Sequence, residues 1–264
     1  MFSKKRIHFF YCVLFVATAQ FICVAGMAQD TSVIKNEIDP AKPTNFYTQV
    51  NFAAEYSFGK ADELIGTRIS GQYTFNPSNL VLFELPLLYN IDRKAGGLGD
   101  IRLRYFGIIK KDYNKTFPKV ATIAPTLDVV FPTGSYKNGL GTSSLIISPG
   151  LVWGWFFNEK TQLFPIISYQ YISKLFTSEV PDDLNFDKHG FTFQAIANYS
   201  FSKKTFLQVT PIFAINDINK GANAFITEFK FSHLPTSKSK IQLFIRQEFT
   251  RRQTTINIGY TIYL

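Results

Sequence analysis

The chain contains 264 residues with a formal net charge of +9, and its two cysteines, Cys12 and Cys23, lie near the N-terminus. From Gln29 onward there is no cysteine, which excludes disulfides, cysteine-ligated metals and a cysteine nucleophile from that part. The same part lacks the roughly 18 consecutive apolar residues that a transmembrane helix needs. The 28 Phe and 13 Tyr residues are therefore expected to be distributed over strands.

The N-terminus has the pattern of a secretion signal. Three basic residues at positions 4–6 precede an apolar run from Ile7 to Val24, and small residues follow from Ala25 to Ala28. This order predicts a signal peptide over residues 1–28, cleaved after Ala28. The polar Gln20 inside the run disfavours the alternative of a membrane anchor. Removal of the segment lowers the formal charge from +9 to +6. The remaining basic excess fits either a solvated surface or attraction to anionic lipids or solutes.

Residues 29–44 are polar and come before the first alternating segment. Two interpretations stay open for them: a periplasmic N-terminal segment, or a plug inside the domain that follows. Residues 45–264 alternate between apolar and polar side chains in segments that recur about every twenty residues, which is typical of strands.

We predict twelve strands in this domain. They are Phe46 to Phe58, Gly66 to Phe75, Leu80 to Ile91, Asp100 to Lys111, Val120 to Phe131, Ser144 to Phe157, Gln162 to Leu175, Gly190 to Phe201, Thr205 to Asn216, Ala222 to Ser232, Lys240 to Thr250 and Gln253 to Leu264. The predicted fold class is all-β, a transmembrane antiparallel up-and-down β-barrel of about 12 strands.

The connections between these segments alternate in length, as they do in outer-membrane barrels. The short ones carry turn residues: Asn76 to Asn79, Asp112 to Lys115, Asn158 to Lys160, Ser202 to Lys204, and Pro235 to Lys238. The others are mostly longer: Gly59 to Ile65, Asp92 to Gly99, Pro132 to Thr142, Phe176 to His189, and Asp217 to Gly221, with a tight last turn near Arg251. We expect the short turns and, with an even strand number, both termini to face the periplasm.

Several strands carry charged residues at mid-strand positions of their polar face. They are Glu55, Arg68, Glu84, Arg102, Arg104, Asp128, Glu228, Lys230, Arg246 and Glu248. In a soluble β-sandwich or lipocalin-like barrel the polar face would point outward, whereas in a membrane barrel it lines the lumen. We expect these residues to line the lumen, with Arg102 and Arg104 beside Asp128, and Glu228 and Lys230 beside Arg246 and Glu248. They either brace the wall or select solutes.

Aromatic residues near strand ends share the opposite, apolar face. They are Tyr73, Phe75, Phe131, Trp153, Trp155, Tyr169, Tyr171, Tyr199 and Phe201. Rings at two heights on the lipid side are typical of membrane barrels, and the outward parity argues against a stacking platform for carbohydrate or nucleic acid. Four phenylalanines fall on the inward face instead, Phe106, Phe164, Phe206 and Phe244, and they predict a partly filled lumen.

The last eleven residues, Thr254 to Leu264, form a one-sided strand whose apolar face runs to the final residue. Such strands are recognised during the insertion of outer-membrane barrels. We therefore expect as partners the outer-membrane lipids, the barrel-assembly machinery and a small-molecule solute, and we expect no nucleic acid.

Four glycine-containing motifs carry a family resemblance. They are Gly96 to Ile101 at a strand start, Pro132 to Tyr136 at the end of the next strand, Gly139 to Thr142, and Ser148 to Leu151. Together they resemble the outer-membrane family labelled for the MetA pathway of phenol degradation, a group of transporters or channels. The resemblance implies the barrel fold, an outer-membrane location and transport of small, hydrophobic or aromatic solutes.

Few residues suit catalysis. The mature chain offers His189, placed in a predicted outer loop, and His233, which follows Ser232 near a predicted turn. The loop Glu179 to Asp183 could offer oxygen ligands to a divalent ion, but exposed carboxylates are usually solvated. We expect no catalytic residue, no metal and no cofactor. A channel or transporter is the leading interpretation, a structural or receptor barrel with an occluded lumen is the alternative, and a membrane acyl hydrolase comes last.

Overall fold

The computed structural model describes residues 46–111, 117–177, 180 and 185–264. The predicted signal peptide, the 29–44 segment, the turn Asp112 to Lys115 and all but Val180 of the loop Glu179 to Asp183 lie outside these residues. The strands are β1 (Gln49–Gly59), β2 (Leu64–Asn76), β3 (Asn79–Asn90), β4 (Ala95–Leu98), β5 (Ile101–Gly107), β6 (Lys110–Lys111), β7 (Lys119–Phe131), β8 (Ile146–Phe156), β9 (Thr161–Ile172), β10 (Lys188–Ser200), β11 (Thr205–Asp217), β12 (Ala222–Thr236), β13 (Ser239–Glu248) and β14 (Gln253–Tyr263).

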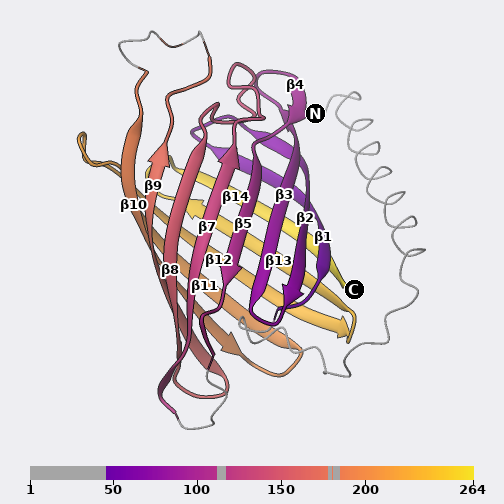
Figure 1. Ribbon diagram of the computed structural model, residues 1–264. Helices are drawn as coiled ribbons and strands as arrows, with labels where there is room; N and C mark the ends of the chain where they lie inside the picture. Colours follow the sequence, from indigo (N-terminus) through magenta and orange to yellow (C-terminus); the bar gives the residue numbers. More distant parts are fainter. Residues whose placement is uncertain (1–45, 112–116, 178–179, 181–184) are drawn as a thin grey trace.

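These strands form one closed antiparallel barrel (Figure 1). Apart from β4, β5 and β6, each strand pairs with the strands before and after it, and β1 closes the sheet by pairing with β14 from Gln49↔Tyr263 to Gly59↔Gln253. In the described residues β4, β5 and β6 follow one another along the same wall position, between β3 and β7. The wall therefore has the predicted twelve strands, and closure leaves no unpaired edge.

The fourth wall strand differs from the prediction. The predicted loop Asp92 to Gly99 is instead a tight turn over residues 91–94 followed by β4, which pairs with β3 from Leu87↔Leu98 to Asn90↔Ala95. Alternation of apolar and polar residues does not reveal β4, because Ala95 and two glycines make up most of it. Beyond Leu98 the strand breaks at residues 99–100 and resumes as β5.

The break releases Asp100 from the strand ladder, and its carboxylate binds the connection between β7 and β8. Asp100 accepts hydrogen bonds from the Gly134 backbone N–H at 2.9 Å and the Thr142 backbone N–H at 2.7 Å. Thr133 Oγ1 donates to the Gly99 carbonyl at 2.7 Å and accepts from the Ile101 N–H at 2.9 Å. Three of the four motifs that carry the family resemblance therefore fold against one another at this end of the barrel.

The two ends of the barrel differ in their longest connections, but the predicted contrast in length is only partial, because β1–β2 and β11–β12 at the end with the longer connections also span four residues each. One end, the turn end, holds the connections β2–β3, β8–β9, β10–β11 and β12–β13, which span four residues or fewer. The opposite end, the loop end, holds the residues between β7 and β8 and between β9 and β10. Gln49 and Tyr263 pair directly, so the first and last wall strands begin and end at the turn end.

The outer surface is apolar and aromatic. Tyr73, Phe75, Trp155, Tyr199 and Phe201 are exposed toward the turn end, and Phe131 and Tyr169 toward the loop end. Trp153 and Tyr171 share the outward parity and are partly exposed. The prediction of outward rings at two heights is thus confirmed. A soluble barrel would not expose so many large apolar side chains, so the wall is that of a transmembrane barrel. Among the described residues, no helix is long and apolar enough to cross a membrane.

Candidate pore

The interior holds a cavity of about 820 Å³. Its lining includes Gln49 and Ser57 near the two ends of β1, and Leu64 and Gln72 toward the two ends of β2. The cavity also follows β13 from Lys240 to Glu248. It therefore runs from the turn end to the loop end along the wall formed by β1, β2, β13 and β14.

All ten charged residues singled out in the sequence line this cavity: Glu55, Arg68, Glu84, Arg102, Arg104, Asp128, Glu228, Lys230, Arg246 and Glu248. Period-two alternation places them inward, because every second side chain of a strand faces the lumen.

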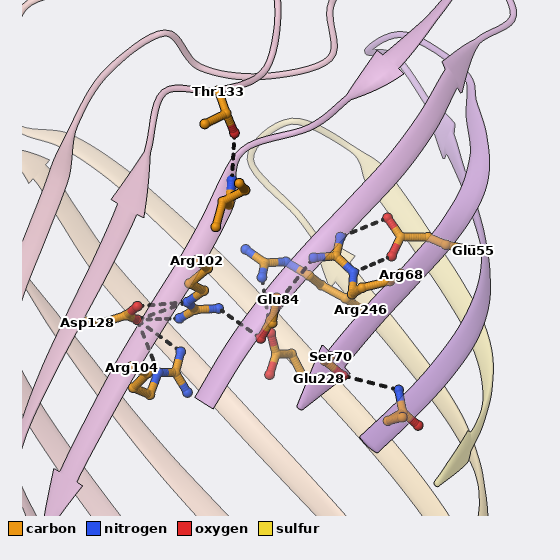
Figure 2. A network of polar contacts seen from close by, with 12 residues as sticks. Glu55, Arg68, Ser70, Glu84, Arg102, Arg104, Asp128, Thr133, Glu228 and Arg246 are labelled. Carbon is orange, nitrogen blue, oxygen red and sulfur yellow. Dashed lines mark hydrogen bonds and ion pairs between the residues drawn. The ribbon is translucent and has the colours of Figure 1, made fainter. Parts of the chain in front are cut away.

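Arg68 is the centre of the first ion-pair cluster (Figure 2). Its guanidinium donates from Nε to Glu55 Oε2 at 2.7 Å and from Nη2 to Glu55 Oε1 at 3.0 Å, a two-bond contact between β2 and β1. Its Nη1 donates to Glu84 Oε2 on β3 at 3.0 Å. The Glu55 side chain is only 7% exposed, so Arg68 provides the compensation for its lost hydration.

The second cluster joins β5 and β7. Asp128 accepts from Arg102 Nε at 2.8 Å and from Arg104 Nη2 at 2.9 Å, so one carboxylate serves two guanidinium groups. Arg102 Nη1 also lies 4.0 Å from Glu84 Oε1. Glu84 therefore links the two clusters into one network across β1, β2, β3, β5 and β7.

A third group lies on β12 and β13. Glu228 and Arg246 are directly opposite in the strand register, and Arg246 Nη1 donates to Glu228 Oε1 at 3.1 Å. Glu248 pairs instead with Arg251 in the following turn, at 3.3 Å. Lys230, which was expected to join this group, makes no ion pair with any described residue. It faces Phe244 across the β12–β13 pairing rather than a carboxylate.

The wall opposite the networks is neutral. The cavity-lining residues of β8 to β11 are serine, threonine, glutamine, asparagine, alanine and isoleucine: Ile146, Ser148, Ile166, Ser168, Gln170, Thr192, Gln194, Ile196, Gln208, Thr210, Ile212, Ala214 and Asn216. A solute in the cavity would thus contact charged groups on one side and uncharged polar or apolar groups on the other.

Apolar side chains fill part of the lumen at the turn end. Ala124, Val152, Phe164 and Ile166 form a buried cluster against which Phe106 packs. On β9 the cavity lining reaches Ile166 and does not include Phe164, which is 4% exposed. Phe206 packs with Leu234 nearby, while Phe244 lines the cavity. The cavity is therefore narrowed on the β7–β9 side of the lumen and lies closer to β1 and β13.

Sequence reasoning missed two charged lining residues, Lys240 and Arg251. Lys240 has the same parity as Gln242, Phe244 and Arg246 in β13, so the alternation could have placed it inward. Arg251 lies in the turn between β13 and β14, where no alternation exists to indicate its direction.

The histidines that were considered for catalysis lie outside this cavity. His233 is an exposed residue of β12 whose Nδ1 contacts Thr205 Oγ1 at 2.9 Å, whereas the neighbouring Ser232 is fully buried toward the interior. The serine and the histidine therefore point to opposite faces of the wall. His189 belongs to β10 rather than to the predicted loop, and it contacts the Tyr169 hydroxyl.

Comparison with known proteins gives a likeness of fold. The solved structure of the NanC porin superposes with a TM-score of 0.61 at 12% identity, over 81% of this chain and 100% of the porin. The COG4313 outer membrane channel from Pseudomonas putida F1 gives 0.60 at 12% identity, over 89% and 100%. The KdgM porin gives 0.52 at 12% identity, over 81% and 99%. No protein-family profile and no curated protein sequence matches the chain. The chain thus has the closed twelve-strand barrel fold of outer-membrane channels.

Proposed function

We propose that this protein is an outer-membrane channel for the passive passage of small solutes. The observation that carries the proposal is the cavity of about 820 Å³ along β1, β2, β13 and β14, inside a wall whose outer face is apolar. Charged and neutral polar side chains line it, and such a lining can replace the hydration of a polar solute. The likeness in fold to outer-membrane channels supports the same function.

Three finer statements belong to the proposal. The resemblance of Gly96 to Ile101 and Pro132 to Tyr136 supports membership of the MetA-pathway family and small hydrophobic or aromatic solutes. The short turns support an orientation in which the turn end faces the periplasm. Both termini then lie in the periplasm, which fits export by the predicted signal peptide and insertion by the barrel-assembly machinery. The separation of Ser232 from His233 supports a function without catalysis.

The proposal predicts solute uptake into proteoliposomes. Vesicles that contain the refolded mature protein are expected to take up a small solute without net charge, such as glycine or arabinose, faster than protein-free vesicles, because the cavity spans the barrel. Light scattering after an osmotic shift measures this rate. A large solute such as raffinose provides the internal control, because the partly filled lumen should slow it most.

Vesicles whose uptake equals that of protein-free vesicles for every solute would contradict the channel. That outcome would favour the alternative of a structural or receptor barrel, in which the apolar cluster around Phe164 closes the lumen.

A further inference from the structure

The lining of the cavity carries seven basic and five acidic side chains. Five of the basic residues take part in ion pairs with the five acidic ones: Arg68, Arg102, Arg104, Arg246 and Arg251 pair with Glu55, Glu84, Asp128, Glu228 and Glu248. The two that remain are lysines, Lys230 on β12 and Lys240 on β13. The positive excess of the lumen is therefore located on these two side chains.

The Lys240 side chain lies in an unusual environment for a cation. The residue is 7% exposed, and no carboxylate among the described residues lies within ion-pair distance of its ammonium group. Its closest described aromatic contact is the Tyr263 ring, with Nζ 5.9 Å from the centroid. A buried ammonium without a counter-charge is unfavourable, so an anion that reaches Lys240 would recover part of the lost hydration.

The surroundings of both lysines can accept an anion. Gln208 and Phe244 are the cross-strand neighbours of Lys230, and Thr261 is the neighbour of Lys240. These cross-strand side chains carry no charge, and Gln208, Gln242 and Thr261 all line the same cavity. Two lumen carboxylates, Glu228 and Glu84, attract Lys230 from beyond ion-pair distance, whereas the charge that acts on Lys240 is that of Lys230. The two ammonium groups also repel each other electrostatically, which an anion between them would relieve.

We propose that Lys230 and Lys240 bind the carboxylate of a small organic anion at the turn-end half of the lumen. Lys230 and Lys240 donate hydrogen bonds to the carboxylate oxygens, while Phe244 contacts the apolar part of the solute. The inference rests on the proposed channel function and adds the charge and chemical class of the preferred solute.

The test uses benzoate, with benzamide as its neutral counterpart of nearly the same shape. In calorimetry on the folded, detergent-solubilised protein, benzoate binds and benzamide does not. The double variant Lys230→Gln with Lys240→Gln binds benzoate weaker by ~10-fold or more, because two charge-assisted hydrogen bonds are lost. Lys204→Gln with Lys238→Gln is the matched control, since these two exposed turn-end residues remove the same number of charges without lining the cavity. Heat-dependent mobility in gels shows that each variant is folded.

In planar bilayers under a salt gradient, the wild type is expected to prefer anions, and benzoate should reduce the current. The double variant loses both properties while it still conducts. Equal binding of benzoate by the wild type and the double variant would overturn the site, as would equal binding of benzoate and benzamide. Absence of any wild-type current, with benzoate binding intact, would overturn the channel function instead and leave the site in place.

Discussion

Replacing both Arg102 and Arg104 by alanine is expected to shift the ion preference of the channel toward cations. The change removes two positive charges from the lumen and leaves Asp128 without the guanidinium groups that bind it at 2.8 and 2.9 Å. Glu84 also loses its contact with Arg102. Asp128 then faces the cavity without a counter-charge, while Glu84 keeps Arg68 at 3.0 Å, and charges that line a low-dielectric path dominate which ion enters.

The ratio of cation to anion permeability should rise by about 3-fold or more, measured from the reversal potential under a salt gradient. The matched control is Lys60→Ala with Lys220→Ala, which removes two positive charges from exposed loop-end residues that do not line the cavity. If the arginine double variant conducts with the same preference as the wild type, these arginines brace the wall and do not select ions.

Replacing Arg68 by methionine should cause the largest loss of stability among the lumen residues. Arg68 holds two carboxylates, and without it Glu55 remains 7% exposed and unpaired, while Glu84 keeps only the 4.0 Å contact with Arg102. Removal of one partner of a buried ion pair typically costs 3–5 kcal/mol, and water in the cavity should reduce this to about 2–4 kcal/mol. Urea unfolding in lipid vesicles, followed by the fluorescence of Trp153 and Trp155, measures this change in free energy.

The compensating variant separates pairing from packing. Adding Glu55→Met to Arg68→Met removes the unpaired carboxylate and should recover most of the stability, to within about 1 kcal/mol of the wild type. Glu55→Gln alone should cost less than Arg68→Met, because Arg68 retains Glu84 at 3.0 Å. A double variant as unstable as Arg68→Met would show that the guanidinium stabilises the wall by packing alone.

The sequence was sufficient to predict the wall of this barrel because alternation shows which residues of a strand share a face, and the assignment as a membrane barrel then places the polar face inward. Glu55, Arg68 and Glu84 sit at inward positions of three strands, and no partner needs to be known to place them there. Alternation does not specify register, however. The bridging position of Glu84 depends on its lying opposite Ser70 on one side and Arg102 on the other, which only the paired strands reveal.

The fourth wall strand shows where alternation fails. Gly96 and Gly97 carry no side chain to indicate a face, so β4 was predicted as loop. Asp100 can bind the backbone N–H groups of Gly134 and Thr142 because the strand breaks after Leu98. The alternation of apolar and polar residues does not indicate this break. Lys230 lines the cavity as expected but forms no ion pair with a described residue. The sequence shows only its charged neighbours along the strand, whereas its uncharged cross-strand neighbours, Gln208 and Phe244, follow from the register.

The central claim is that solutes and ions cross this barrel through the cavity along β1 and β2. The most direct test is the single-channel conductance of Ser70→Trp compared with Ile69→Trp in planar bilayers. Ser70 lines the cavity on β2, and Ile69, its neighbour in sequence, points to the lipid side. The wild type is expected to show small, discrete conductance steps, which Ser70→Trp reduces several-fold and Ile69→Trp leaves unchanged, because only the former places an indole in the path. Equal conductance in all three proteins, or no conductance in the wild type, would contradict this account.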